Sequence, residues 1–263
     1  MTTSFVDIHC HILPGIDDGA ADWDESLAMA QLAAGDGTTT IIATPHQLGS
    51  FGHNIGDSIR HSVNELQQRL KDAGVPLTVL AGADVRIEEQ LVERLLSGEV
   101  LTLGDHRRHV LVELPHELYL PLEPLIERLS RHNIAAILSH PERNQGILRR
   151  PEVLGPLVDA GCLMQITAGS LCGSFGAECK QLAESMTVDG LVHFVATDGH
   201  GARSRRPLIS RAFERVSQLA GYDVAVALCS ENPACVAVGQ SVQSDRRRSH
   251  STRRRWWSKK SVA

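Results

Sequence analysis

The chain has 263 residues and a formal net charge of −5, with 42% hydrophobic and 22% charged residues. This mix is that of a globular chain of one large or two small domains, and it excludes collagen, coiled coil and whole-chain disorder. No apolar run reaches the roughly 18 residues of a membrane-spanning helix, the first residues lack the basic region of a signal peptide, and the six cysteines form no Cys-x-x-Cys pair, so we expect a cytoplasmic protein without a signal peptide.

Seven short apolar or β-branched runs predict strands along the first 200 residues. In chain order they are Phe5–Ile8, Thr38–Ala43, Leu77–Ala81, His109–Leu114, Ile134–Leu138, Leu163–Thr167 and His193–Thr197. Stretches with helical spacing lie between most of these runs. The clearest are Asp22–Ala34, Ser58–Ala73, Glu88–Leu96, Leu122–Arg131 and Val153–Ala160.

This alternation of strands and helices predicts an α/β fold with a parallel sheet. Seven units in one unbroken chain favour a closed or nearly closed β/α barrel, and a doubly wound sheet is the structural alternative. No linker precedes residue 240. We therefore expect a single folded domain over residues 1–240 and a basic, disordered tail over residues 241–263.

Acidic and imidazole side chains recur at the ends of the predicted strands. Six of the seven strands carry His, Asp or Glu at or just past the carboxyl end, which is where β/α barrels place functional side chains. These residues are His9, His11, His46, Asp84, Glu113, His140, Asp198 and His200, together with Asp17 and Asp18 in the loop after the first strand.

Neutral imidazoles and carboxylates together suit Zn, Mn, Fe and related divalent ions. Five histidines and several acids are more ligands than one ion needs, so the pattern predicts a multi-metal hydrolytic centre. Each piece alone has a structural explanation: Asp17-Asp18-Gly19 reads as a turn, and Asp84 as a helix cap. The coincidence at six strand ends favours the metal centre.

Two arginines follow the proposed ligands closely in sequence. Arg143 comes three residues after His140, and Arg205 comes five residues after His200. A guanidinium group binds phosphate oxygens with a planar fork of donors. Arginines beside a metal centre therefore indicate phosphoester hydrolysis more than amide hydrolysis, although Arg205 is flanked by Arg203 and Arg206 and could equally be a surface residue.

These residues resemble the PHP family, named for its polymerase and histidinol phosphatase members, and within it the bacterial protein tyrosine phosphatases of capsule and exopolysaccharide synthesis. The resemblance covers about Phe5 to Gln240. Its pieces are DIHCHILPGIDDGA (7–20), ATPH (43–46), GADVRI (82–87), LVELP (111–115), LSHPERN (138–144), QITAGSLCGSFG (165–176), ATDGH (196–200) and SENPACVAVG (230–239).

The resemblance implies a distorted seven-stranded (β/α)7 PHP barrel holding three divalent ions, most often Mn, with Zn, Fe or Co as alternatives. It assigns His9, His11 and Asp198 to one ion and Glu113 and His140 to a second. His46, His200 and Asp18 would hold the third, with Asp17 as the alternative to Asp18. Asp84 stands where the family usually has a bridging Glu, and Arg143 and Arg205 match the catalytic arginines.

The implied function is hydrolysis of phosphotyrosine by a metal-bound hydroxide, regulating a bacterial tyrosine kinase of polysaccharide synthesis and export. Tyrosine is a good leaving group because its pKa is about 10. None of the six cysteines has an arginine six positions later, which argues against a cysteine-dependent phosphatase. The alternatives are a PHP phosphomonoesterase acting on a small molecule such as histidinol phosphate, a metal-dependent amidohydrolase, and a non-catalytic binding module recruited to a membrane.

The last twenty residues, 244–263, form a basic tail. They hold six Arg, two Lys and one Asp, a net charge of +7, which leaves −12 on the other 243 residues. The tail lies outside the resemblance. An anionic membrane surface, with Trp256 and Trp257 at the interface, is one partner that this composition fits. Nucleic acid is a less favoured partner, and a solvated tail without a partner is the third reading.

Overall fold

The computed structural model describes residues 4–243, and every strand pairing in that part of the chain is parallel. A three-stranded sheet has the order β1 (Phe5–Cys10), β2 (Thr38–Ala43), β4 (Thr78–Ala81). A six-stranded sheet has the order β3 (His46–Gln47), β5 (Asp84–Arg86), β6 (His109–Glu113), β7 (Ala135–Ser139), β8 (Leu163–Thr167), β9 (Phe194–Ala196). The predicted α/β fold with parallel pairing is confirmed.

All seven predicted strand runs contain a strand, and the chain adds two short strands that the sequence pattern does not reveal. Strand β2 breaks at Thr44-Pro45 and is followed by β3, while β4 breaks at Gly82-Ala83 and is followed by β5. Proline lacks the N–H that a sheet ladder needs. A Cβ at Gly82 would lie 2.6 Å from the Ile42 side chain, so the close approach of these two segments requires glycine.

The first and last strands come together at their carboxyl ends. Cys10 and Gly199 form a parallel bridge, the Asp198 N–H donates to the His9 carbonyl at 2.7 Å, and the His11 N–H donates to the Gly199 carbonyl at 2.8 Å. The two sheets are therefore linked by backbone hydrogen bonds at the point where His9, His11 and Asp198 lie.

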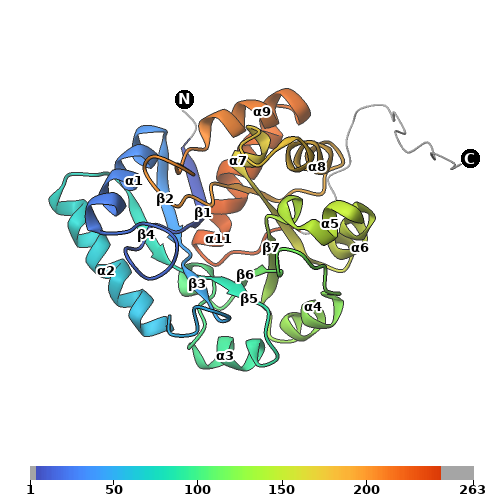
Figure 1. The fold of residues 1–263 in the computed structure, drawn as a ribbon, viewed down its shortest axis with the longest axis horizontal. Coiled ribbons are helices and arrows are strands. Elements are labelled where there is room, and N and C mark those ends of the chain that lie inside the picture. The colour runs from blue at the N-terminus through green and yellow to red at the C-terminus, as the bar shows by residue number, and fades with distance from the viewer. Residues whose placement is uncertain (1–3, 244–263) are drawn as a thin grey trace, which may run out of the picture.

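Helices surround the strands along most of the periphery (Figure 1). The α-helices are α1 (Trp23–Gly35), α2 (Gly56–Asp72), α3 (Leu91–Ser97), α4 (Glu123–Ser130), α5 (Gln145–Arg149), α6 (Leu154–Asp159), α7 (Ala168–Leu171), α8 (Ala177–Val188), α9 (Ser210–Ala220), α10 (Tyr222–Val226) and α11 (Asn232–Ala237). Short 3-10 helices are η1 (Leu103–Asp105), η2 (Pro141–Arg143) and η3 (Pro151–Val153), and η4 (Ala227–Glu231) is a π-helix. The five predicted helices lie at α1, α2, α3, α4 and α6; α3 begins three residues later than predicted.

Two apolar clusters fill the fold. The larger lies between the strands and the helices, and the smaller takes one or two residues from most strands together with Val236 and Ala237 of α11. The strand members of the smaller cluster are Val6, Ile8, Ile42, Leu111, Ile137, Leu163, Phe194 and Ala196. The strands thus carry apolar side chains on both faces, which is the pattern of buried parallel strands.

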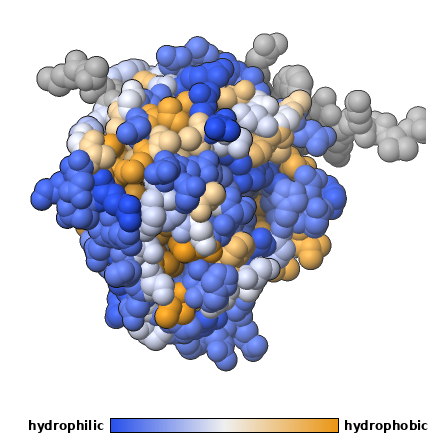
Figure 2. Space-filling model, turned by 60° about the vertical axis from the view of Figure 1, so that its left-hand side comes forward, coloured by the Kyte–Doolittle hydropathy of each residue, from blue (hydrophilic) through white to orange (hydrophobic). Residues whose placement is uncertain are grey.

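The surface turned forward in Figure 2 is mostly hydrophilic and is broken by small hydrophobic groups. Within residues 4–243, no helix combines the length and the apolar character that crossing a membrane requires. The structure describes residues 241–243 of the predicted disordered tail, and the rest of it, residues 244–263, lies outside the described residues.

Candidate metal centre

Several site residues continue the inner faces of their strands. Leu111 belongs to the smaller apolar cluster, here called the inner cluster, and Glu113 stands two residues further along β6. Ala196 belongs to the same cluster, and Asp198 stands two residues beyond it. Because side chains repeat on one face every two residues, the periodicity that builds the apolar layer delivers Glu113 to the carboxyl end of β6, whereas Asp198 lies past the end of β9 and has a left-handed φ of 50°.

Strand β1 reaches the site by breaking this alternation. Ile8 lies in the inner cluster, yet His9 and His11 also face the site. The register of β1 against β2 shifts between Asp7 and Cys10, so the strand is irregular where the change of face occurs. Irregularities of this kind re-aim side chains next to active sites, and here one brings both imidazoles to the inner side.

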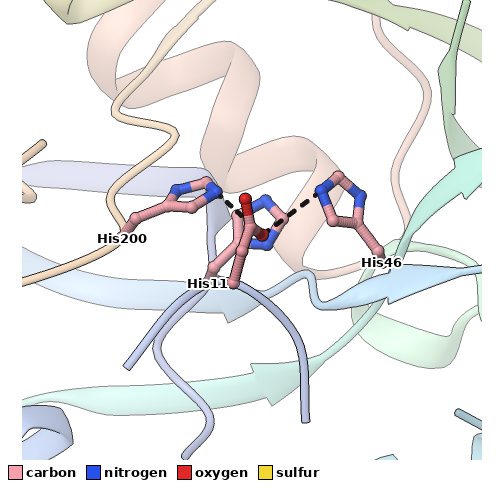
Figure 3. A group of neighbouring side chains, drawn as sticks. His11, His46 and His200 are labelled. Atoms are coloured by element: carbon pink, nitrogen blue, oxygen red, sulfur yellow. Dashed lines mark ion pairs between the residues drawn. The ribbon is translucent and has the colours of Figure 1, made fainter. Parts of the chain in front are cut away.

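The structure brings all nine predicted metal ligands together in four overlapping groups, in each of which the ligand atoms lie within 4.8 Å of one another. The groups are His11, Asp18, His46 and His200; His9, His11 and Asp84; His9, His140 and Asp198; and His46, Asp84 and Glu113. Figure 3 shows the imidazoles of His11, His46 and His200 converging from separate strand ends.

The tautomers of two central histidines follow from their hydrogen bonds. The Nδ1 atom of His9 donates to Gln165 Oε1 at 2.9 Å, and that of His11 donates to Asp17 Oδ2 at 2.7 Å. With Nδ1 engaged in this way, Nε2 is the atom that each imidazole turns toward the other, and the two Nε2 atoms lie only 3.2 Å apart. Two Nε2 atoms this close fit a shared cation, either a proton or a metal ion, and an outer partner on Nδ1 is the usual arrangement around a metal-bound histidine.

Asp17 and Asp18, which the sequence leaves as alternatives, have different surroundings. The Oδ1 atom of Asp18 lies 3.4 Å from His200 Nε2 and 3.5 Å from His46 Nε2, and 56% of its side chain is exposed. Asp17 instead accepts from His11 Nδ1 and from the His46 backbone N–H. The geometry fits Asp18 as a ligand and Asp17 as the residue that orients His11.

Asp84 lies at the centre of the cluster and is fully buried. Its Oδ2 atom is 3.7 Å from His9 Nε2 and 3.4 Å from His46 Nδ1, and neither carboxylate oxygen has a hydrogen-bond partner within residues 4–243. Burying a carboxylate without a partner is costly, whereas cations bound between these imidazoles would satisfy both oxygens. The donor set therefore fits divalent metal ions, and it fits a bridging role for this carboxylate.

The acidic side chains give the cluster a strong preference for positive charge. Burial alone would lower the pKa of His11, but its hydrogen bonds with Asp17 and Asp198 outweigh burial and raise the pKa to about 10. Despite burial, the nearby His9, His11 and His140 imidazoles hold the pKa of Asp198 well below its usual range. A site that stabilises a proton so strongly at this point also favours a metal cation there.

At the other end of the cluster, burial and the neighbouring Asp84 charge raise the pKa of Glu113 to about 7. Burial lowers the pKa of His140 to about 3, which leaves its imidazole neutral and able to donate a lone pair. The two side chains face each other, with His140 Nε2 3.7 Å from Glu113 Oε1, and Arg86 Nε lies 2.7 Å from the other carboxylate oxygen.

Both predicted arginines lie at the rim of this cluster and both donate to the same oxygen, Oδ2 of Asp198, through Arg143 Nη1 and Arg205 Nη2. The other oxygen of Asp198 faces His9 and His11 at 3.3 and 3.4 Å. One carboxylate therefore connects the guanidinium pair with the proposed metal site, which would place both where a phosphoryl group could contact them.

Three site residues have left-handed backbone angles. The φ angles are 32° at His140, 50° at Asp198 and 48° at Arg205. Residues other than glycine pay for this conformation, and such strain concentrates at functional sites. His140 and Asp198 lie just past β7 and β9, where the chain turns to bring ligands inward, and Arg205 lies further along the loop after β9.

The sequence pattern misses three residues that shape the site. Gln165 orients His9, Phe175 lies against both arginines, and buried Asp7 accepts from the Thr197 N–H at 3.0 Å, tying β1 to the end of β9. Gln165 could have been found as the polar residue two positions after Leu163 on an inner strand face. No signal distinguishes the roles of Asp7 and Phe175 without the fold.

A family model described as capsular polysaccharide synthesis, CpsB/CapC, matches residues 5–237 of the chain. The chain belongs to this family. The CpsB/CapC match covers every predicted ligand and both arginines, and it confirms the resemblance to the bacterial tyrosine phosphatases of capsule synthesis.

Curated relatives support the CpsB/CapC assignment. The tyrosine-protein phosphatase YwqE of Bacillus subtilis is 38% identical over 202 residues, which are 76% of this chain and 79% of YwqE. The tyrosine-protein phosphatase CpsB of Streptococcus pneumoniae is 25% identical over 242 residues, which are 90% of this chain and 100% of CpsB.

Comparison with solved structures gives both a match to a structure from a study of the YwqE and CpsB phosphatases and a match in fold alone. A structure from a study of YwqE and CpsB, described as unique metal-dependent tyrosine phosphatases, matches with a TM-score of 0.87 and 34% identity, over 90% of this chain and 96% of the solved one. The phosphotriesterase homology protein of Escherichia coli matches with a TM-score of 0.56 at 13% identity and shares the fold alone.

Proposed function

We propose that this member of the CpsB/CapC family is a metal-dependent protein tyrosine phosphatase. The observation that carries the proposal is the meeting of nine metal-donor side chains with two guanidinium groups at one set of strand ends. The family match and the YwqE and CpsB phosphatases support it.

The proposed centre holds three divalent ions, with Mn as the first choice. His9, His11 and Asp198 would hold one, Glu113 and His140 a second, and His46, His200 and Asp18 the third, with Asp84 between them. When bound, such ions acidify a water for attack on phosphorus and offset charge on the phosphoryl oxygens.

The residues of the chain have separate tasks in this scheme. Arg143 and Arg205 donate to the phosphoryl oxygens and stabilise the charge that spreads over them during transfer. About 30% of the Arg205 side chain is exposed, and its Nε atom has no hydrogen-bond partner among the described residues. The phenolate of tyrosine leaves readily because its pKa is about 10, so no strong general acid is required.

For the cellular role, we propose a phosphotyrosine protein as substrate, with a tyrosine kinase of polysaccharide synthesis as the first candidate, in the cytoplasm. The backbone bridge between Cys10 and Gly199 supports closure of the strands as a distorted seven-stranded barrel within a single domain of residues 1–240. Residues 244–263 are proposed to contact anionic membrane surfaces through their net charge of +7.

The test uses the purified full-length chain. Chelator removes bound metal, Mn²⁺ is added back, and phosphate release is followed from a phosphotyrosine peptide and from histidinol phosphate, with His9→Ala as the control. Metal-dependent release from the peptide alone is expected. Release from histidinol phosphate alone would keep the metal centre but refute the tyrosine phosphatase, and no release from either would refute both substrates.

A further inference from the structure

The segment after β8 carries a motif to which the metal centre gives no role. It runs from Ala168 to Gly176, through α7 and into the loop before α8, and it holds Phe175. The Arg143 guanidinium carbon lies 4.1 Å from the centroid of the Phe175 ring, and that of Arg205 lies 5.9 Å from it. One half-buried aromatic ring therefore contacts both arginines.

This segment is anchored to the turn that carries Arg143. The side chain of Glu142 is fully buried, and its Oε1 atom accepts from the Thr167 N–H at 2.8 Å and from the Ser170 hydroxyl at 2.7 Å. Glu142 precedes Arg143 in η2, so the carboxylate ties the start of α7 to the same short element that presents the first arginine. Among the described residues, Glu142 belongs to none of the four metal-ligand groups, and this tie is the task that its hydrogen bonds indicate.

Glycine allows the ring to reach its position. A Cβ at Gly169 would lie 2.8 Å from Cε2 of Phe175, closer than side chains approach one another. The Ser174 N–H donates to the Gly169 carbonyl at 2.8 Å, and Gly173 and Gly176 have φ angles of 85° and 93°. The loop is thus folded tightly against α7, with the ring packed on the one residue of the helix that has room for it.

The two guanidinium groups need such a support because they carry like charges. Both donate to a single oxygen of Asp198, which offsets one positive charge and leaves the other. The face of an aromatic ring attracts a cation. Phe175 therefore adds attraction where the carboxylate alone is insufficient, and it does so without occupying the guanidinium donors that a phosphate would use.

We propose that Phe175 is a positioning residue that holds Arg143 and Arg205 together as one phosphate-binding pair, on a loop that Glu142 and Gly169 keep in place. The proposal rests on the proposed phosphatase function for its substrate, and on the contacts of the ring with the two guanidinium groups for the pairing itself. It assigns a task to the AGSLCGSFG run that follows β8.

The test compares Phe175→Leu, which keeps an apolar side chain without a ring, with Phe175→Tyr, which keeps the ring. Binding of inorganic phosphate to the Mn-loaded full-length protein is measured by calorimetry, and KM and kcat are measured with a phosphotyrosine peptide. Phe175→Leu is expected to weaken phosphate binding and to raise KM by about tenfold. Phe175→Tyr should stay within about twofold of the unmodified protein.

A second readout does not depend on turnover. The ring current of Phe175 should shift the side-chain NMR signals of Arg143, and Phe175→Leu should remove that shift while Phe175→Tyr keeps it. Trp23→Leu is the matched control. It removes a ring whose centroid lies 4.3 Å from the guanidinium carbon of Arg69, an arginine with no part in the site, and it should leave phosphate binding unchanged.

The outcomes separate this inference from the phosphatase proposal. If the unmodified protein binds phosphate in a Phe175-dependent way without hydrolysing the peptide, the positioning role stands and the proposed function fails. Unchanged phosphate affinity in Phe175→Leu, equal weakening in Phe175→Tyr, or no phosphate binding by the unmodified protein would each overturn the positioning role.

Discussion

Two adjacent carboxylates, Asp17 and Asp18, should respond differently to the same isosteric change to asparagine. Asp17 accepts three hydrogen bonds, from His11 Nδ1 at 2.7 Å, from the His46 N–H at 3.0 Å and from the Gly19 N–H at 2.9 Å. Asp18 accepts none of these, and its side chain is 56% exposed between His46 and His200.

The magnitudes follow from these partners. An asparagine at position 17 has one carbonyl oxygen, so its NH₂ group must face a backbone or imidazole donor. Leaving a donor without an acceptor costs about 1–3 kcal/mol of unfolding free energy, and losing the partner of a metal-bound histidine typically weakens metal affinity about 10–100-fold. At position 18 the metal-free protein should lose less than about 1 kcal/mol, because the Asp18 side chain is 56% exposed and solvent screens its ion pairs, while metal binding at His46 and His200 is lost.

The assay therefore measures two quantities, the stability of the metal-free protein and its metal binding. Urea unfolding of the chelated proteins gives the stability change without metal, and metal content after dialysis against buffered Mn²⁺ gives the binding change. We expect Asp17→Asn to lower both the stability of the metal-free protein and its metal binding, and Asp18→Asn to lower metal binding alone. The reasoning is refuted if Asp18→Asn destabilises the metal-free protein as much as Asp17→Asn does, or if Asp17→Asn leaves both quantities unchanged.

Three further changes test separate features. Gln165→Leu leaves His9 Nδ1 without its acceptor and should weaken metal binding about 10–100-fold in a metal titration, whereas Gln67→Leu, which alters a part-buried amide away from the site, should not. Burial lowers the pKa of His109 to about 4, against 6.5 for a free histidine, so the unfolded chain takes up the proton first as pH falls. Between pH 7 and 5 the metal-free protein should therefore lose about 2 kcal/mol of unfolding free energy, measured by urea unfolding, and His109→Phe should not show this loss. Deleting residues 244–263 should abolish co-sedimentation with anionic vesicles while peptide turnover continues, and unchanged co-sedimentation would refute the membrane contact.

The fold class could be predicted because the strands are buried on both faces. Runs such as Thr38–Ala43 and Leu163–Thr167 have the same bounds in the sequence prediction and in the structure, since continuous apolar and β-branched stretches leave little choice of conformation. Strands β3 and β5 could not be predicted from the sequence. They have two and three residues, too short for any periodicity, and they exist because neighbouring segments pair with them.

The candidate site could be predicted as a set of residues because side-chain chemistry and strand ends are both visible in the sequence. What each member does required distances. Asp17 and Asp18 are adjacent in the chain and identical in chemistry, and only the contacts of Asp17 with His11 separate an orienting acid from a candidate ligand. Gln165 and Phe175 were not predicted as site residues, because an amide and an aromatic ring carry no metal-binding pattern and their partners are far away in sequence.

The departures from regular strand geometry coincide with candidate ligands, and there is a geometric reason for this. A strand that continues its alternation can supply one inner side chain every two residues, as β6 does with Glu113. More ligands are needed than regular strand ends can offer. The register shift in β1 and the left-handed angles of His140 and Asp198 supply the remainder. Each departure costs free energy in the fold, so the ordered apolar layer beneath the site is what allows these strained ends to persist.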